Sequence, residues 1–456
     1  MNSAHTEKTD HTSRQRRTAS PRRNALELLL SVTEEGKYSN LSIKEGLGDY
    51  SETDSRFIAA LVYGTLDRLF LLDFIISKYT DARLKPQIRG ILRMGLYQAF
   101  FMRIPVSAAC NESVKLAKET GKSALAGFVN GVMRNAAKCS IEELLSTLGT
   151  NERLSVEYSF PKFMVDEYVD LYGTEFAEKL LASLSSGESA GMTLRAQPPY
   201  TVKQLGEHLS ALGLPYKAGL YSKNALISEK GFKVSDDTLF KAGGFTVQSE
   251  SAMLVCDACG AKPGMSVLDA CAAPGGKTAC LAAAMQNTGT ITALELHPHR
   301  TALMEASLKR LNVTNAECVT ADASVFNEAF ADSMDVVLVD APCSGLGVTG
   351  KPDARYDKTP ARLEQLAKTQ YALLETCSRY VKNGGALVYS TCTISKRENE
   401  DVAAAFIKAH PEFRLGSLAE YMPEALKESA KNGMLQLFPS RDGTDGFFIA
   451  RMEKNA

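Results

Sequence analysis

Ser266-Val267-Leu268-Asp269-Ala270-Cys271-Ala272-Ala273-Pro274-Gly275-Gly276-Lys277-Thr278 joins a short apolar run to an acid, small residues, a Pro-Gly-Gly turn and the start of a helix-forming segment. This order predicts a β-strand, a tight loop and a helix whose N-terminal N–H groups can face a ligand. The stretch spells neither G-x-G-x-x-G nor G-x-x-x-x-G-K-[ST]. It is therefore either an ordinary βα turn or a loop for a nucleotide-like ligand, without a phosphate-binding fingerprint.

Composition places the chain among soluble globular proteins. It has 456 residues, of which 45% are hydrophobic and 23% charged, enough for about three domains. No apolar stretch approaches the roughly 18 residues that a membrane span needs, and the polar N-terminus lacks an apolar signal core. We therefore expect a cytoplasmic protein with no membrane partner. Ten cysteines, mostly within apolar runs, favour reduced thiols over a disulfide framework.

The N-terminal end is basic although the net charge of the chain is only −1. Residues 1–24 carry four more basic than acidic side chains. We expect residues 1–20 to form a disordered basic arm, which is common both in proteins that touch phosphate backbones and in solubilising tails.

Residues 21–145 show apolar residues at three- and four-residue spacing, which predicts an all-α bundle. Four arginines are scattered along it. They either line an RNA-facing surface or lie on solvated helix backs; they are Arg89, Arg93, Arg103 and Arg134.

Residues 150–245 begin with helices and continue as a small α/β module. Short strands are expected at Met192–Ala196 and Ala225–Ile227, with a helix around Val202–Leu212 between them. A compact unit of sheet and helix placed before a catalytic domain can hold single-stranded RNA, as RRM-like modules do.

Residues 246–454 alternate strands with helices, which predicts a mostly parallel Rossmann-like sheet covered on both faces. A Gly- and Asp-rich turn in the tail predicts an antiparallel hairpin at one edge of the sheet. Strands are expected at Ser266–Asp269, Thr290–Glu295, Glu317–Asp322, Asp335–Asp340 and Ala386–Ser390, and helices at Lys277–Met285, Pro298–Leu311 and Pro360–Val381.

Four of these strands end in or next to an acid: Asp269, Glu295, Asp322 and Asp340. Ligands of such sheets bind beyond the C-terminal strand ends, so the four carboxylates should share one rim. Glu295 is placed to accept hydrogen bonds from ribose hydroxyls, and Asp322 to meet an adenine amino group. S-adenosylmethionine fits this pocket better than NAD, because no pyrophosphate-binding glycine fingerprint is present.

Two cysteines follow neighbouring strands. Cys343 lies in Asp340-Ala341-Pro342-Cys343-Ser344-Gly345, and Cys392 lies in Tyr389-Ser390-Thr391-Cys392-Thr393. Free cysteines are usually small core residues, but loops after strands suit that interpretation poorly. The C-x-x-C of Cys256 and Cys259 has no second ligand pair for zinc and is interpreted as one side of a helix, so no metal is expected.

Thiols and an acid in this arrangement suit methylation of a cytosine ring. A thiolate that adds to C6 turns C5 into a nucleophile, and an acid at N3, such as Asp340, assists the addition. The base must be unstacked to reach the thiol. Lys277, or the helix N-terminus beside it, can help to keep the thiol ionised.

Motifs over residues 248–451 closely resemble those of the RNA cytosine-5 methyltransferases of the NOL1/NOP2/Sun group. They are the Leu268–Thr278 stretch, Asp340-Ala341-Pro342-Cys343-Ser344, Ser390-Thr391-Cys392-Thr393 and Asp442-Gly443-Thr444-Asp445-Gly446-Phe447-Phe448. Phe128-Val129-Asn130-Gly131-Val132-Met133-Arg134-Asn135 makes the helical domain resemble the NusB-like RNA-binding domain. The combination is similar to bacterial enzymes that methylate cytosine in 16S rRNA.

The resemblance implies a class I methyltransferase domain, S-adenosylmethionine as methyl donor and 16S rRNA, not DNA, as partner of a monomeric enzyme. Cys392 would be the nucleophile, Cys343 would assist product release, and Asp340 and Lys277 would stand beside them. The cofactor site would be lined by Cys271, Ala272, Ala273, Pro274, Gly275, Gly276, Lys277, Glu295, Asp322 and Asp340. Two features differ from the family pattern: Glu295 replaces the usual Asp, and the arginine pair expected after Cys343 is absent.

Two alternatives stay open on the sequence. DNA cytosine-5 methyltransferases use the cysteine of a Pro-Cys motif, which Pro342-Cys343 matches, and Glu398-Asn399 echoes their Glu-Asn element. That assignment leaves Cys392 without a role. The second alternative is a ribosome-assembly factor that binds RNA and keeps the methyltransferase fold only as a scaffold.

Overall fold

The computed structural model describes residues 20–37, 39–48, 50–185, 191–350, 352, 355 and 358–456. The arm expected at residues 1–20 lies outside this part of the chain, apart from Ser20. The chain forms two compact units, Met1–Ser159 and Phe160–Ala456. Across the described residues, no helix combines the length and apolar character that crossing a membrane would require.

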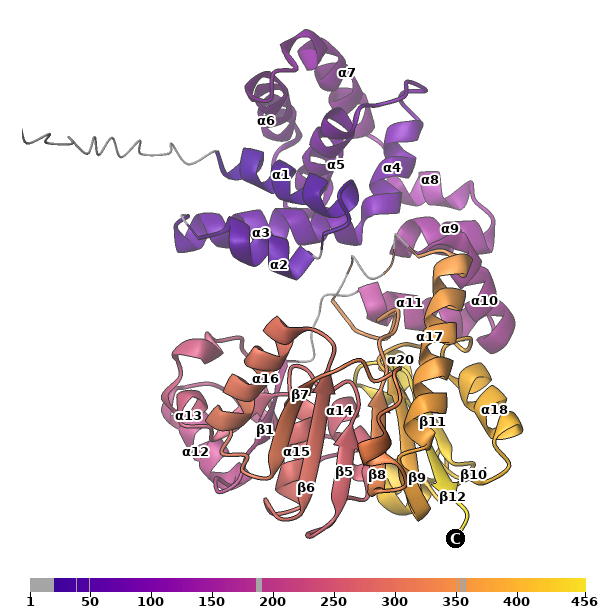
Figure 1. Ribbon diagram of the computed structural model, residues 1–456. Coiled ribbons are helices and arrows are strands. Elements are labelled where there is room, and N and C mark those ends of the chain that lie inside the picture. Colours follow the sequence, from indigo (N-terminus) through magenta and orange to yellow (C-terminus); the bar gives the residue numbers. More distant parts are fainter. Residues whose placement is uncertain are drawn as a thin grey trace, which may run out of the picture. The chain divides into compact units, whose positions relative to one another are not determined.

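The first unit is all-α, as predicted (Figure 1). Side-chain caps begin several helices: Ser20 accepts from the N–H of Arg23, and Ser51 from that of Asp54. Leu29, Ile58 and Leu92 are fully buried between the helices. The helices are α1 (Pro21–Thr33), α2 (Ser39–Gly46), α3 (Glu52–Asp67), α4 (Leu69–Ser77), α5 (Pro86–Phe101), α6 (Val106–Glu119), α7 (Ala126–Ala136), α8 (Ile141–Ser146) and α9 (Thr150–Tyr158).

The arginines of this unit do not share one role. Arg93 is buried, and its guanidinium makes a two-pronged ion pair with Asp73, with Nε to Oδ1 at 2.7 Å and Nη2 to Oδ2 at 2.5 Å. For Arg93 both the RNA-facing and the solvated interpretations were wrong, because the guanidinium is buried and pairs with the partly exposed Asp73 of the preceding helix. Arg103 and Arg134 are exposed.

The second unit opens with two helices and a small antiparallel sheet of order β2-β3-β1-β4. Leu205 and Leu209 of the helix α12 pack against Leu194 and Phe245 of this sheet. The predicted strands β1 and β3 and the helix α12 are confirmed, while β2 and β4 were not predicted. The elements are α10 (Lys162–Tyr172), α11 (Thr174–Ser185), β1 (Met192–Ala196), α12 (Val202–Ala211), β2 (Tyr216–Ala218), β3 (Ala225–Ser228), α13 (Thr238–Lys241) and β4 (Phe245–Val247).

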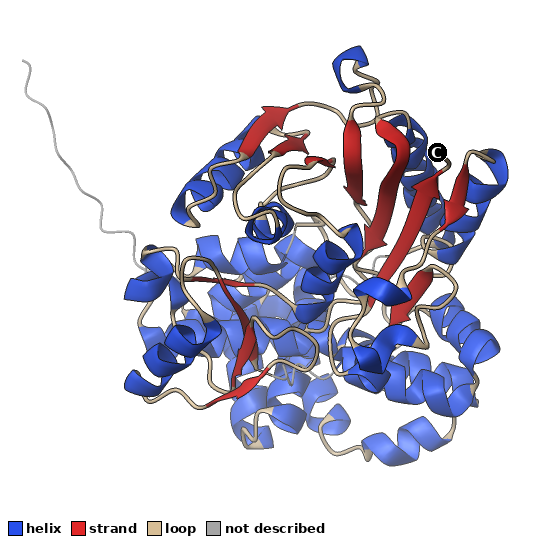
Figure 2. Ribbon diagram, turned by 90° about the horizontal axis from the view of Figure 1, so that it is seen from below, coloured by secondary structure: helices blue, strands red, loops and turns tan. Residues whose placement is uncertain are grey.

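The same unit contains an eight-stranded sheet, whose strands are red in Figure 2. Its order is β10-β12-β9-β8-β5-β6-β7, and β11 pairs with β12. The run from β7 to β9 is parallel, and β10, β11 and β12 are antiparallel, as a mostly parallel Rossmann-like sheet requires. The strands are β5 (Ser266–Asp269), β6 (Thr290–Glu295), β7 (Ala316–Thr320), β8 (Met334–Asp340), β9 (Val381–Thr391), β10 (Phe413–Leu415), β11 (Met434–Leu437) and β12 (Phe447–Lys454).

Helices cover both faces of this sheet because its central strands are apolar on both sides. In β8, Val336 and Leu338 join the core under α14 and α15, while Val337 and Val339 join the core under α17 and α18. The helices are α14 (Glu250–Cys259), α15 (Gly276–Ala284), α16 (Pro298–Arg310), α17 (Pro360–Ser378), α18 (Glu400–Ala409), α19 (Glu424–Lys427) and α20 (Pro439–Asp442).

One expectation about this sheet was wrong in detail, and one about its edge was confirmed. The strand β7 ends at Thr320, so Asp322 lies two residues beyond it on an exposed turn. The expected antiparallel hairpin of β11 and β12 lies at the edge of the sheet: β9 pairs with one side of β12, and β11 and β10 pair one after the other with its opposite side. Three-residue strands such as β10 carry too little alternation to be read from sequence.

Candidate active site

The loop after β5 is held at its base by Asp269. This carboxyl is fully buried and accepts a hydrogen bond from the Thr278 hydroxyl at 2.8 Å, while its Oδ1 has no partner within the described residues. Burial raises the pKa of Asp269 from 3.8 to about 6. An orphaned acceptor beneath the loop is suited to an N–H or O–H donor of a ligand or of a water molecule.

The loop itself, residues 270–275, is small and closely tied to the sheet. The N–H groups of Ala270 and Ala272 bond the carbonyls of Leu338 in β8 and Leu294 in β6, both at 2.9 Å. Gly275 has a φ of +95°, and a Cβ there would lie 3.1 Å from Met304 Cγ, so a side chain would be both strained and crowded. The loop therefore places backbone atoms that no large side chain covers at the N-terminus of α15.

The loop residues named from sequence lie as follows. Ala272 and Gly275 are buried, Ala273 and Gly276 are half-buried, and Pro274 is exposed. Cys271 is half-buried, and burial raises the pKa of its thiol.

Glu295 ends β6 at 4% exposure, at the predicted place. It accepts from the N–H of His297 at 3.0 Å and forms an ion pair with Arg300 at 2.9 Å. Arg300 also donates to the carbonyl of Ala273 at 3.1 Å, so it joins the second strand end to the loop. Arg300 could not be recognised from the sequence, because one basic residue early in a helix carries no signal by itself.

Asp322 differs from Asp269 and Glu295 because its side chain is exposed to solvent, whereas theirs are buried. It accepts hydrogen bonds from the Ser324 hydroxyl at 2.6 Å and the Ser324 N–H at 2.9 Å. These bonds lower the pKa of Asp322. The side chain is thus fixed by its own turn.

Asp340 ends β8 and binds two neighbours. The Lys277 ammonium donates to its Oδ2 at 2.6 Å, and the Ser390 hydroxyl donates to its Oδ1 at 2.8 Å. Burial opposes the charge of Lys277, but the Asp340 carboxylate outweighs it and raises the pKa of the ammonium, with a further contribution from the Cys392 sulfur. Lys277 and Asp340 therefore form an ion pair whose ammonium is also stabilised by the sulfurs of Cys256 and Cys392.

Cys343 and Cys392, 49 residues apart, meet with their sulfurs 3.2 Å from each other. Both thiols are half-buried, so each keeps some surface. Their loops are also joined through the backbone: Ala341 N–H bonds Ser390 O at 2.9 Å, and Gly347 N–H bonds Cys392 O at 3.1 Å. The predicted juxtaposition at neighbouring strand ends is therefore present. Cys256 and Cys259, by contrast, are buried in α14, as the helix interpretation required.

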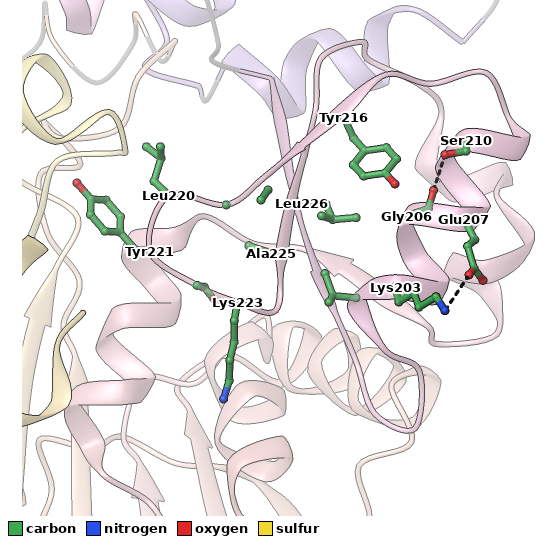
Figure 3. A pocket seen from close by; sticks show the side chains of 14 residues that line it. Lys203, Gly206, Glu207, Ser210, Tyr216, Leu220, Tyr221, Lys223, Ala225 and Leu226 are labelled. Atoms are coloured by element: carbon green, nitrogen blue, oxygen red, sulfur yellow. Dashed lines mark hydrogen bonds and ion pairs between the residues drawn. The ribbon is translucent and has the colours of Figure 1, made fainter. Parts of the chain in front are cut away.

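A separate pocket of about 790 Å³ lies on the four-stranded module (Figure 3). Tyr216 leans toward α12 beside Gly206, and Tyr221 and Leu220 lie across the pocket from it. Lys203 and Lys223 also line it. This pocket is built by β2, β3 and α12 and is distinct from the rim that carries the acids and thiols.

Comparisons with known proteins cover both units. The family model described as 16S rRNA methyltransferase RsmB/F matches residues 259–453, and the NusB family model matches residues 19–138. A probable ribosomal RNA small subunit methyltransferase B of Bacillus subtilis is 37% identical, over 94% of this chain and 98% of that protein. Its counterpart in Synechocystis is 32% identical, over 95% and 99%. The crystal structure of PH0851 has a TM-score of 0.79 over 96% of this chain and 99% of that one, at 24% identity, which shows a shared fold.

Proposed function

Since this chain belongs to the 16S rRNA methyltransferase RsmB/F family, we propose that it transfers a methyl group from S-adenosylmethionine to carbon 5 of one cytosine in 16S rRNA. The observation that supports this best is the 3.2 Å contact between Cys343 and Cys392, beside the Lys277–Asp340 ion pair. Neither a fully buried core pair nor a scaffold requires two partly exposed cysteines in contact at the ends of neighbouring strands.

The residues around the loop fit S-adenosylmethionine, which when bound would supply an electrophilic methyl group. Residues 271–277 would hold it, because their small side chains and the free N–H groups of α15 leave room for a ligand close to the backbone. Glu295 would accept from the ribose hydroxyls, and Asp340 would lie beside the methionine part. Asp322 would meet the adenine amino group from its turn. The orphaned Oδ1 of Asp269 is the buried acceptor that supports this fit.

In the proposed reaction Cys392 acts first. Its thiolate adds to C6 of an unstacked cytosine, forming an S–C6 bond and moving the ring electrons toward N3. Asp340 would relay to N3 a proton taken from the Lys277 ammonium that is hydrogen-bonded to it, leaving a neutral amine. The resulting enamine makes C5 nucleophilic toward the methyl group.

Release reverses the addition. The C5 proton leaves to water, the C5=C6 double bond re-forms, and the S–C6 bond breaks with its electrons returning to Cys392. The proton at N3 goes back to the Lys277–Asp340 pair. Cys343 would hydrogen-bond the departing sulfur, which is the assistance assigned to it here.

For the RNA partner, we propose that the helical unit and the four-stranded module contact 16S rRNA, and that a monomer suffices. The NusB family match to residues 19–138 supports contact by the helical unit, and the pocket lined by Lys203 and Lys223 supports contact by the four-stranded module.

Single cysteine substitutions test the mechanism. With 16S rRNA and S-adenosylmethionine, Cys343→Ala should accumulate a covalent RNA–protein adduct visible on a denaturing gel, and Cys392→Ala should form none. Adducts in Cys392→Ala that disappear in Cys343→Ala would instead assign the nucleophile as in DNA cytosine-5 methyltransferases. Binding of rRNA by wild type without transfer of labelled methyl would favour the scaffold alternative.

A further inference from the structure

Glu398 is a buried acid beneath the loop of Cys343. Its exposure is 0%, and the carboxylate accepts four hydrogen bonds. The Ser344 N–H and the Gln370 amide donate to Oε2 at 2.9 and 3.0 Å, and the Ser344 hydroxyl donates to Oε1 at 2.5 Å. The Thr393 hydroxyl reaches Oε1 at 3.5 Å. One side chain therefore binds the residue after Cys343 and the residue after Cys392.

Asn399 completes this connection from the other side. Its Oδ1 accepts from the Thr391 hydroxyl at 2.6 Å, and its Nδ2 donates to the Thr393 carbonyl at 3.0 Å. Asn399 therefore bonds the residues on both sides of Cys392, and Glu398 bonds the residue that follows Cys343. Both hydrogen-bonding residues precede α18, which packs against α17.

The charges around the two sulfurs are unequal. The carboxylate of Glu398 disfavours a second negative charge nearby, and the pKa of Cys343 is raised by the hydrogen bond with Cys392, by burial and by Glu398. Lys277, on the other side, gains stabilisation of its charge from the Cys392 sulfur. The charge of Glu398 therefore disfavours a thiolate at Cys343, whereas the Lys277 ammonium is stabilised by negative charge at Cys256 and at Cys392.

We propose that Glu398 is a positioning residue, whose hydrogen bonds to the residues after Cys343 and after Cys392 fix the two cysteine loops to each other and give the two thiols their different roles. The inference rests on the proposed function for its catalytic meaning, but the division of ionisation between the thiols is a property of the folded chain alone. It explains how two thiols at 3.2 Å can have different roles.

Alkylation of the full-length protein by iodoacetamide, with initial rates at each cysteine measured by mass spectrometry across pH, tests the proposal. In wild type, Cys392 should react with a midpoint at lower pH than Cys343. In Glu398→Gln, which keeps the shape but loses the charge, the Cys343 midpoint should fall to lower pH. Glu398→Asp should keep it near the wild-type value, and Asp401→Asn, on the exposed start of α18, should change neither.

Methylation gives the second readout. Glu398→Gln should lower kcat at least tenfold and leave KM for rRNA within about twofold of the wild-type value. The reason is that the variant still binds rRNA, but in the complex Cys392 is no longer ionised in preference to Cys343. A wild-type Cys343 midpoint below that of Cys392 would overturn the proposal, and so would a Cys343 midpoint unchanged in Glu398→Gln. A higher alkylation rate at every pH with an unchanged midpoint would mean simple loosening and would also overturn it. Alkylation needs neither RNA nor methyl donor, so its outcome is independent of the proposed function.

Discussion

At the scale of single residues, Asp269 combines an energetic cost to the fold with a place in the proposed ligand site. Its pKa is raised to about 6, so the folded chain holds this proton to higher pH than the unfolded chain. The free energy of unfolding therefore falls as pH rises from about 4 to about 6, and the loss is complete above that range. A buried carboxylate with an orphaned oxygen is unfavourable for the fold alone, which is typical of residues kept for binding.

We predict that Asp269→Asn is more stable than wild type at pH 7.5, by on the order of 2 kcal/mol, and no more stable at pH 4. Asparagine has no charge to bury and still accepts from Thr278. Thermal denaturation at both pH values without ligand measures this, and binding of S-adenosylmethionine by the same variant should weaken. Asp322→Asn is the control: the pKa of Asp322 is lowered, so its loss should not stabilise the chain. If the effect of Asp269→Asn on stability did not depend on pH, ionisation of the buried Asp269 carboxyl could not be the cause of the destabilisation.

At the scale of elements, α4 and α5 are joined by the ion pair of Asp73 and Arg93 inside the first unit. The two partners are buried to different degrees, since the Arg93 side chain is 6% exposed and that of Asp73 is 36% exposed. Removing the acid leaves a buried guanidinium without its carboxylate, whereas removing the arginine leaves a carboxylate that reaches water.

We therefore expect Asp73→Ala to cost about 3 kcal/mol of stability and Arg93→Met clearly less. Arg103→Met, at an exposed position, should be close to neutral. Calorimetric unfolding of the full-length variants ranks the three substitutions by the loss of unfolding free energy. Equal losses of stability in Asp73→Ala and Arg93→Met would contradict this expectation and show that the ion pair behaves as one exposed to solvent.

The strands and helices also show which parts of the site could be predicted from sequence patterns. Strands that end in acids placed Asp269, Glu295 and Asp340 on one rim, because parallel strands share the direction of their C-terminal ends. The meeting of Cys343 and Cys392 followed from the same rule. Arg300 and the hydrogen bonds of Glu398 could not be derived, since they depend on how helices approach loops many residues away in the chain. The position of Asp322 differed because β7 is shorter than its apolar pattern suggested.

At the scale of the whole molecule, the chain divides its proposed tasks between two compact units with separate cores. Every residue proposed to hold S-adenosylmethionine belongs to the unit 160–456, and the NusB family match falls within the unit 1–159. A ligand stabilises the structure to which it binds, by about 2.7 kcal/mol at a concentration one hundred times its dissociation constant. The methyl donor should therefore act on one unit only.

We predict that saturating S-adenosylmethionine raises the unfolding temperature of the second unit by several degrees and leaves the first unit unchanged. Hydrogen exchange of the full-length protein during heating separates them, because peptides from α5 report on one unit and peptides from β5 and β8 on the other. Glu295→Ala, which lacks the carboxylate proposed to bind ribose, should reduce the shift at the same ligand concentration. If α5 and β5 were protected to the same extent, the two units would have to unfold together, and binding at the strand rim would stabilise the helical bundle as well.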